Sequence, residues 1–407
     1  MIIEEFQAKN LVKKIYPSLF LWADYTLNPY QGCYHDCKYC DGKSEGYYMH
    51  SDFAERIHVK SNAVSLLTTF FKKNIKGSDI FSSEETKNQK LPFTIFIGGG
   101  VCDVYQPVEK KIRLTREILQ AVYDYGASVI LLTKNANVLE DIDLLKKINK
   151  ATYASVNFTI TLYDDNLQKI FEPRASSTTE RFNAIKTLRN EGIDSGIYFL
   201  PILPFIGDTD ENISQIVSKA REVKASFVYS GGLTLKPGKN KNEFFSVLKE
   251  YFPKILPKYE LLYSNNNRYG ILDYKIARRF KLVRPEIKVY KYLYENKLDY
   301  APKRYIPEDR MASNLKIVEL LLRIAYIKET ILGLWKDAYW IKKDAYYIEN
   351  YKRDILDLKR EELLSLPITK ITFEHIVEYL AKGYSAYLSE LESLVYRKSG
   401  GIKYERN

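Results

Sequence analysis

The chain has 407 residues, a hydrophobic fraction of 45% and a formal net charge of +11, values that suit a globular protein with one large and one smaller domain. Its start carries Glu4 and Glu5 where a secretory signal carries positive charge, and no stretch approaches the roughly 20 apolar residues that span a bilayer, so we expect a cytoplasmic protein that does not enter a membrane. Only four cysteines occur, three of them within eight residues, which argues against a disulfide framework and favours a metal in a reducing compartment.

The first predicted elements alternate between strands and helices from about residue 24 to residue 235. Short runs rich in Ile, Val, Phe or Tyr predict strands over residues 24–28, 93–97, 128–133, 154–162, 195–200 and 226–235. Amphipathic helices lie between them, such as residues 177–190, where Phe182, Ile185 and Leu188 form an apolar stripe and Gly192 follows the end. This repetition requires parallel strands with right-handed crossovers, so we expect an α/β fold, either a partial (β/α)6 TIM-like barrel or a doubly wound sheet. Ligands of such sheets bind at the carboxyl ends of the strands.

A basic, aromatic stretch follows Pro237, over residues 273–294. It contains the cations and rings Lys275, Arg278, Arg279, Lys281, Arg284, Lys288, Lys291, Tyr274, Phe280 and Tyr290. These side chains could follow a phosphate backbone while the rings stack on bases, but a solvated helix face has the same composition.

The last part of the chain is predicted to be helical from Ser313 onward. Apolar residues recur there at helical spacing and predict a packed core face: Ile317, Leu320, Leu321, Ile324, Ile331 and Trp335. We therefore expect an N-terminal segment (1–23), a core domain (24–240) and a basic, mainly helical C-terminal region (241–407).

The net charge of +11 has two interpretations. A basic chain gains affinity for polyanions through counterion release. Chains rich in Lys, Ile and Tyr, with few Cys, Met and His, are also typical of high-temperature proteomes, in which charge serves ion-pair networks. Charge alone therefore leaves nucleic-acid binding open.

Three cysteines carry the strongest chemical signal. Cys33, Cys37 and Cys40 stand at C-x3-C-x2-C spacing in the loop after the first predicted strand. A short loop of this kind can place three thiolates on one face of an iron–sulfur cube and leave the fourth iron without a protein ligand. An open iron can bind a small molecule and pass an electron to it, whereas a fully ligated cluster normally only transfers electrons.

Other interpretations of these thiols stay open. With His35 they could form a Cys3His zinc site, although His35 lies between closely spaced ligands and zinc knuckles usually use two separated pairs. The thiols could also be a chance cluster in a loop. The remaining histidines, His50, His58 and His375, show no metal-ligand spacing.

The cysteine triad, with the aromatic Tyr39 before its last member, resembles the radical S-adenosylmethionine (SAM) superfamily. Further stretches are similar to its spore photoproduct lyase-like branch: NPYQGC at 28–33, DVYQPVE at 103–109, LTKN at 132–135, EPRA at 172–175 and ER at 180–181. The resemblance covers about residues 25–240. It implies a 4Fe-4S cluster whose open iron binds SAM, and a 5′-deoxyadenosyl radical that abstracts hydrogen from the substrate.

The resemblance also implies roles for further residues. The turn Gly98, Gly99 and Gly100 after the second strand would let backbone approach the SAM amino group, or it is an ordinary tight turn. Lys134, at the end of the third strand, would pair with the SAM carboxylate. Two polar residues of the fourth strand, Ser155 and Asn157, would bond the aminoacyl or ribose part, or only a neighbouring backbone group. Tyr39 would cover the adenine, or pack under the loop.

Cys102 is a departure from the branch. The lyase has a cysteine hydrogen donor two residues ahead of a Ser-Asp pair; here that pair is Cys102-Asp103, and the donor position falls on Gly100. Repair of spore photoproduct therefore does not carry over. Cys102 is our catalytic candidate as a displaced donor; it could instead touch SAM or be a small buried hydrophobe.

We thus expect a lyase-like radical SAM enzyme that abstracts hydrogen, with a nucleic acid as the candidate substrate and a reducing electron donor. Auxiliary clusters, as in peptide-modifying relatives, are disfavoured because no further thiols follow Cys102. Nothing in the sequence calls for an obligate protein partner. The alternative is a zinc-stabilised nucleic-acid-binding protein without catalysis.

Overall fold

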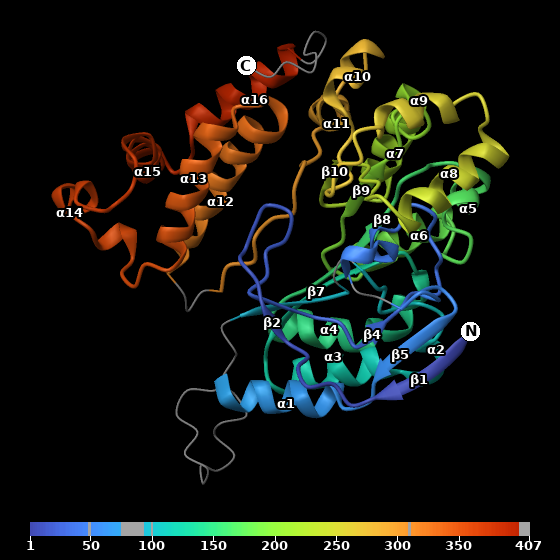
Figure 1. Cartoon of the computed structure of the whole chain (residues 1–407). Coiled ribbons are helices and arrows are strands. Elements are labelled where there is room, and N and C mark those ends of the chain that lie inside the picture. The colour runs from blue at the N-terminus through green and yellow to red at the C-terminus, as the bar shows by residue number, and fades with distance from the viewer. Residues whose placement is uncertain (48–49, 75–92, 99–100, 308–310, 399–407) are drawn as a thin grey trace.

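A parallel sheet, curled toward a barrel, organises the computed structural model, which describes residues 1–47, 50–74, 93–98, 101–307 and 311–398 (Figure 1). The strand order is β10-β9-β8-β7-β6-β3-β2. The neighbouring strands from β3 to β10 are all parallel, and only the short β2 is antiparallel. Their bounds are β2 Lys13–Lys14, β3 Tyr25–Leu27, β6 Thr94–Ile97, β7 Ser128–Thr133, β8 Ala154–Thr159, β9 Ile197–Ile202 and β10 Val228–Gly232. Each predicted strand is present, and the α/β partial barrel is confirmed.

Helices separate these strands along the chain and cover the outer face of the sheet (Figure 1). They are α1 Ala63–Asn74, α2 Glu109–Ile112, α3 Leu114–Asp124, α4 Ile142–Ala151, α5 Asp165–Phe171, α6 Thr178–Asn190 and α7 Asp210–Glu222. The strands read as continuous apolar runs because both faces are covered; every residue of β6 and β8 is buried. Helix α6 begins with a capping box between Ser177 and Glu180, and its predicted stripe is buried.

The N-terminal segment, residues 1–23, joins both sheets. A second sheet pairs β1 (Ile2–Phe6) in parallel with β5 (Arg56–Lys60), which also pairs with β4 (Tyr30–Gln31). Strand β2 adds to the edge of the large sheet. Strand β1 was not predicted, because its sequence IIEEF shows no alternation of apolar and polar residues; most of its residues are exposed.

After β10 the elements of the described ranges are helices, and none is long and apolar enough to cross a membrane. They are α8 Lys239–Tyr251, α9 Leu256–Leu262, α10 Tyr274–Arg279, α11 Pro285–Asn296, α12 Ala312–Tyr326, α13 Trp335–Glu349, α14 Arg360–Leu364, α15 Lys370–Lys382 and α16 Ala386–Lys398. In Figure 1 the orange and red helices α12 to α16 form a group beside the barrel, and α11 lies between this group and β10.

The C-terminal core prediction is confirmed for α12 and wrong for Trp335. The predicted residues of α12, together with Ile331, are buried, but the Trp335 side chain is 55% exposed. A π-helical turn, η5 (Ile327–Ile331), and Gly333 at φ +75° interrupt the helix before α13 begins. Because this break changes the helical phase, the spacing that placed Trp335 on the core face no longer applies.

The rings and cations of the basic stretch 273–294 are not arranged as the stacking hypothesis requires. Tyr290 is buried, and Phe280 packs against Phe205. The exposed residues of the stretch include Lys275, Arg279 and other cations. Most of its cations therefore face solvent, although Arg284 and Lys288 donate to backbone carbonyls. The two rings pack against the core and are not stacking platforms.

Candidate functional site

A cavity of about 150 Å³ lies at the carboxyl ends of β6 to β9 and collects most of the predicted site residues. Its lining includes all three cysteines of the motif, Cys102 and Lys134. Residues of the strand ends complete the wall, among them Phe96, Leu132, Thr159 and Leu200. This is the edge of a parallel sheet at which ligands bind.

Backbone geometry and a buried glutamine hold the start of the cysteine loop. Gly32 has φ +87°, and a Cβ there would lie 2.4 Å from the Arg56 carbonyl oxygen, so only glycine fits. The Gln106 side chain donates to the Gly32 carbonyl (3.1 Å) and accepts from the Tyr34 N–H (2.8 Å). Because Gln106 is fully buried, these bonds fix the entry of the loop.

Helix α8 holds the other end of the loop. The Asn240 amide donates to the carbonyl oxygens of Tyr39 (3.2 Å) and Cys40 (2.8 Å). The Lys43 ammonium lies 2.5 Å from both Asp36 and Glu243. The loop is thus fastened to the opposite side of the barrel.

The thiols lie in a dry environment. Burial raises the pKa of the Cys37 thiol to about 12, although the nearby Lys134 ammonium acts in the opposite direction. Burial likewise raises the pKa of Cys33, of Cys40 and of Cys102. Protein groups alone therefore keep these side chains as thiols, and binding of a cationic metal group releases their protons.

Asp103 joins the ends of two strands to the cysteine loop. Its carboxylate accepts from the Thr133 hydroxyl (2.7 Å) and the Lys134 N–H (2.7 Å), and it lies 3.4 Å from Nδ1 of the buried His35. Burial acts to raise the pKa of this carboxyl, but His35 and these donors hold it at about 2. Sequence reasoning gave Asp103 no role and considered His35 only as a zinc ligand; the DVYQPVE stretch was the available signal for Asp103.

Lys134 supplies a buried cation to the cavity. Burial acts to lower the pKa of its ammonium, but Cys37 and Glu172 nearby raise it overall, so the side chain stays charged. Its Nζ lies 5.9 Å from the centre of the Tyr39 ring. Among the described residues no carboxylate comes within 4.0 Å of it, which leaves this charge available to an anionic ligand.

A buried ion pair orients Tyr39. Glu172 and Arg181 form an ion pair with both side chains 0% exposed. The Tyr39 hydroxyl donates to Glu172, which also accepts from Gln168 (3.0 Å). Since the Tyr39 ring lines the cavity, this pair sets the position of the ring and of the thiol beside it. The EPRA and ER stretches of the sequence contain both members.

The predicted residues of β8 lie deeper than the cavity. Asn157 accepts from the Gly196 N–H (2.9 Å) and donates to Ser155 (3.0 Å), and neither residue lines the cavity. Both residues thus make hydrogen bonds to neighbouring protein groups, and their contact with SAM stays a prediction. Thr159 lies on the same face two residues further on and reaches the cavity.

The glycine turn is described only at its start. Gly98 lines the cavity with φ +103°, and a Cβ there would lie 2.7 Å from the Leu132 carbonyl oxygen. Only a residue without a side chain lets β6 and β7 approach so closely. Gly99 and Gly100 lie outside the described residues.

The donor set fits an iron–sulfur cluster. Three thiols of one loop face a common cavity beside a buried cation, which is the arrangement of a 4Fe-4S cluster with one open iron. Within the described part of the chain, no three His, Cys, Asp or Glu side chains are arranged to share one metal ion. A cube takes each thiolate on a different iron, so its thiolates stand farther apart than the ligands of a single ion.

Comparison with known proteins identifies the family. The profile of the radical SAM superfamily matches residues 27–220. An uncharacterized protein of Methanocaldococcus jannaschii is 32% identical over 258 residues, which cover 63% of this chain and 86% of that protein. An uncharacterized protein of Mycobacterium tuberculosis is 24% identical over 263 residues, which cover 64% of this chain and 73% of that protein. A structure of spore photoproduct lyase with bound AdoMet and dinucleoside spore photoproduct aligns at a TM-score of 0.48 and 17% identity, covering 72% of this chain and 78% of that chain. The chain belongs to the radical SAM superfamily, whose members are enzymes that use a 4Fe-4S cluster and SAM.

Proposed function

We propose that this enzyme is a member of the spore photoproduct lyase-like branch and abstracts hydrogen from a nucleic-acid substrate. The observation that carries the proposal is one cavity that combines three loop thiols, a buried ammonium and a further thiol at the carboxyl ends of parallel strands. Cys33, Cys37 and Cys40 would hold a 4Fe-4S cluster, which would supply the electron for reductive cleavage of SAM to methionine and a 5′-deoxyadenosyl radical.

The chain's own residues bind and orient SAM in this proposal. Lys134 pairs with the SAM carboxylate, because its ammonium is a buried cation at the strand edge. The open backbone at Gly98 and the Thr159 hydroxyl contact the aminoacyl and ribose parts, since both line the cavity. Tyr39, held by Glu172, closes one side of the site and excludes water.

Cys102 serves as the hydrogen donor in this proposal. Burial keeps its thiol protonated, and it comes from the loop after β6, outside the motif that holds the cluster. A buried thiol facing the cavity can return a hydrogen atom to a substrate radical; the thiyl radical that this leaves takes one electron from the reducing donor and a proton to become the thiol again. This role would replace the donor that the branch has at the position of Gly100.

Nucleic acid is the proposed substrate because the protein carries a net charge of +11 and α10 with the turn after it carries several exposed cations. The zinc-protein alternative is not favoured, since the family match is to radical SAM enzymes.

The test is anaerobic reconstitution with iron and sulfide, followed by incubation with reductant, SAM, and single-stranded DNA or RNA. We expect visible iron–sulfur absorption that is lost in Cys37→Ala but kept in Cys102→Ala, which removes a thiol of the same cavity. We also expect 5′-deoxyadenosine release that rises when oligonucleotide is added. Zinc without iron, or release that no nucleic acid stimulates, contradicts the proposal.

A further inference from the structure

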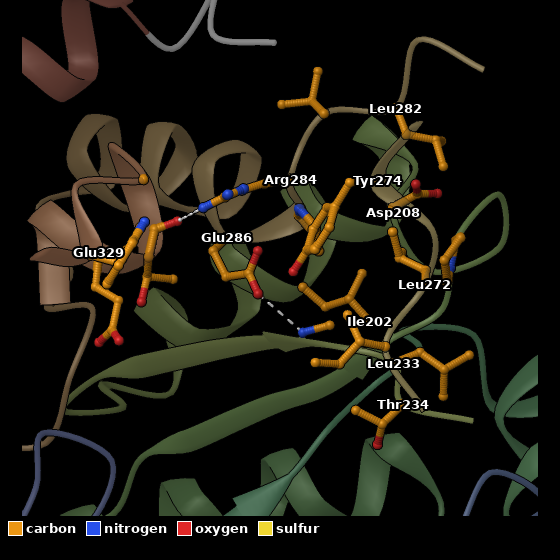
Figure 2. Close-up of a pocket in the computed structure, with 18 residues that line it drawn as sticks. Ile202, Asp208, Leu233, Thr234, Leu272, Tyr274, Leu282, Arg284, Glu286 and Glu329 are labelled. Atoms are coloured by element: carbon orange, nitrogen blue, oxygen red, sulfur yellow. Dashed lines mark hydrogen bonds between the residues drawn. The ribbon is translucent and has the colours of Figure 1, made fainter. Parts of the chain in front are cut away.

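A second, larger cavity of about 420 Å³ lies beyond the ends of β9 and β10 (Figure 2). Its lining includes Ile202 of β9, two residues after Leu200, which lines the smaller cavity. Its volume falls in the range of roughly 300–1,000 Å³ typical of small-molecule sites. No residue predicted from the sequence to bind SAM or the cluster lines it.

The polar side chains of this cavity include three carboxyls, Asp208, Glu286 and Glu329, beside Arg284, Thr234 and Thr330. Figure 2 shows Glu286 in the middle of the group, between Glu329 on one side and Tyr274 on the other. The Glu286 carboxyl accepts from the Gly232 N–H (3.2 Å), and no side chain of the described residues donates a hydrogen bond to it. Burial raises the pKa of this carboxyl. Its oxygens keep lone pairs that can accept further hydrogen bonds. Glu286 thus has hydrogen-bonding capacity for a ligand.

The remaining walls are apolar and aromatic. Ile202, Leu233 and Leu272 lie on one side, and Tyr274 and Trp335 contribute rings. Such walls accept a flat, hydrophobic group, and the Glu286 carboxyl in the middle of the group selects ligands that carry N–H donors. A nucleobase has this combination, because adenine, cytosine and guanine carry exocyclic amino donors.

The surroundings of the cavity are basic and aromatic rather than acidic. Exposed cations stand in the segment that leads into the cavity wall: Lys275, Arg278, Arg279 and Lys281. On the other side, Trp335 begins an exposed face of α13 on which Tyr339 follows one helical turn later, with side chains 55% and 58% exposed. Cations with exposed rings are typical of surfaces that bind single strands, whereas a cationic peptide would be repelled.

We propose that this cavity receives one unstacked base of a single-stranded nucleic acid, with the Glu286 carboxyl accepting hydrogen bonds at the edge of the base. The phosphates lie along the cations around Arg279, and a neighbouring base stacks on Trp335. This inference rests on the proposed function and names the recognition site of its substrate. Extruded bases are read elsewhere by the same means, namely edge hydrogen bonds and apolar walls.

The first test uses the reconstituted wild-type enzyme and fluorescence anisotropy of labelled 12-mer DNA strands, of each single base or with one central abasic site. We expect an abasic site to weaken binding about fivefold or more, because stacking and edge contacts are lost. We also expect strands with amino-bearing bases to bind more tightly than oligo-dT. Equal affinity for all of these strands overturns the proposal without need of any variant.

The second test compares Glu286→Gln with Glu295→Gln. Both residues belong to α11, nine positions apart and so on opposite faces, and Glu295 is exposed. Glu286→Gln should change the order of base preference and weaken the preferred strand about fivefold or more, whereas Glu295→Gln should bind as wild type. Arg279→Ala should lower the affinity for all strands equally, including the strand with the abasic site. It should also reduce the number of counterions released on binding, measured from the salt dependence of the affinity, by about one.

The outcomes separate this inference from the proposed function. Base-dependent binding without oligonucleotide-stimulated 5′-deoxyadenosine contradicts the proposed function and supports the cavity as a base site. If oligonucleotide stimulates the release of 5′-deoxyadenosine, but Glu286→Gln and Glu295→Gln have equal effects on DNA binding, only the cavity inference is overturned. The inference is also overturned if a Lys-rich peptide binds more tightly than any DNA strand and Glu286→Gln abolishes the binding of that peptide.

Discussion

Replacing Arg181 by methionine removes the cation of the buried pair that positions Tyr39. Arg181 and Glu172 are both 0% exposed, so water cannot solvate the carboxylate that remains. Removing one partner of a buried pair destabilises a protein by about 3–5 kcal/mol. Since whole domains are stable by only about 5–15 kcal/mol, Arg181→Met should be among the most damaging single changes on α6.

The loss of stability in Arg181→Met should depend on pH. Burial acts to raise the pKa of Glu172, but Arg181 and Lys134 hold it below its ordinary value of 4.5 in the folded wild type. This carboxyl therefore adds stability above pH 4.5, which is lost as the pH falls through the lowered folded value. In Arg181→Met burial dominates and the pKa rises, so the deficit against wild type is largest near pH 7 and shrinks on acidification.

The measurement is urea unfolding at several pH values, followed by circular dichroism and tryptophan fluorescence, whose coincidence checks two-state behaviour. Arg189→Met is the matched control. Arg189 also lies on α6 and pairs with Asp194 at 2.7 Å, but its side chain is 31% exposed. A pair of this kind contributes about 0–1 kcal/mol. A loss for Arg181→Met no larger than for the control, or a deficit that grows on acidification, refutes the reasoning.

Three further substitutions test the cavity. Lys134→Met should weaken SAM binding roughly 10- to 100-fold in equilibrium dialysis, because hydrogen bonds of charged groups contribute about 1.5–3 kcal/mol; unchanged affinity contradicts the assignment. Gly98→Ala should lower stability by about 1–3 kcal/mol, as its Cβ meets the Leu132 carbonyl, and should lower the thermal midpoint more than Gly192→Ala, which has positive φ but open space. Cys102→Ser should keep its iron and SAM affinity but alter the products seen by mass spectrometry, whereas loss of iron would make Cys102 a cluster ligand.

The strands and the cysteine motif were predictable because their signals are local. The six predicted strands of the large sheet are short runs rich in Ile, Val, Phe or Tyr, and the thiol spacing lies within one loop. Strand β2 consists of two lysines and was not predicted. The distance of a strand residue from the cavity could not be predicted in this way. Asn157 and Thr159 share a face, and only the stagger of neighbouring strands decides which of them reaches the cavity. Sequence periodicity predicts which face of the sheet a side chain lies on, but not how close it lies to the cavity at the strand ends.

Contacts between distant segments were the other limit. His35 and Asp103 meet only because the first loop folds over the ends of β6 and β7. The larger cavity likewise combines strand ends with residues of α10 and α11, such as Tyr274 and Glu286. No local pattern marks such a site. Trp335 was misplaced for a related reason, since the π turn before α13 resets the helical phase without a sequence pattern that we recognised.

The fastening of the cysteine loop by α8 has a consequence for biosynthesis. Asn240 bonds the carbonyls of Tyr39 and Cys40, and Lys236 lies 2.6 Å from Asp41. A nascent chain that has left the ribosome only as far as β8 lacks both anchors, so its thiols are not yet arranged to receive iron. Maturation by the iron–sulfur delivery machinery must therefore follow translation of nearly the whole barrel, and a truncated product would be a poor acceptor.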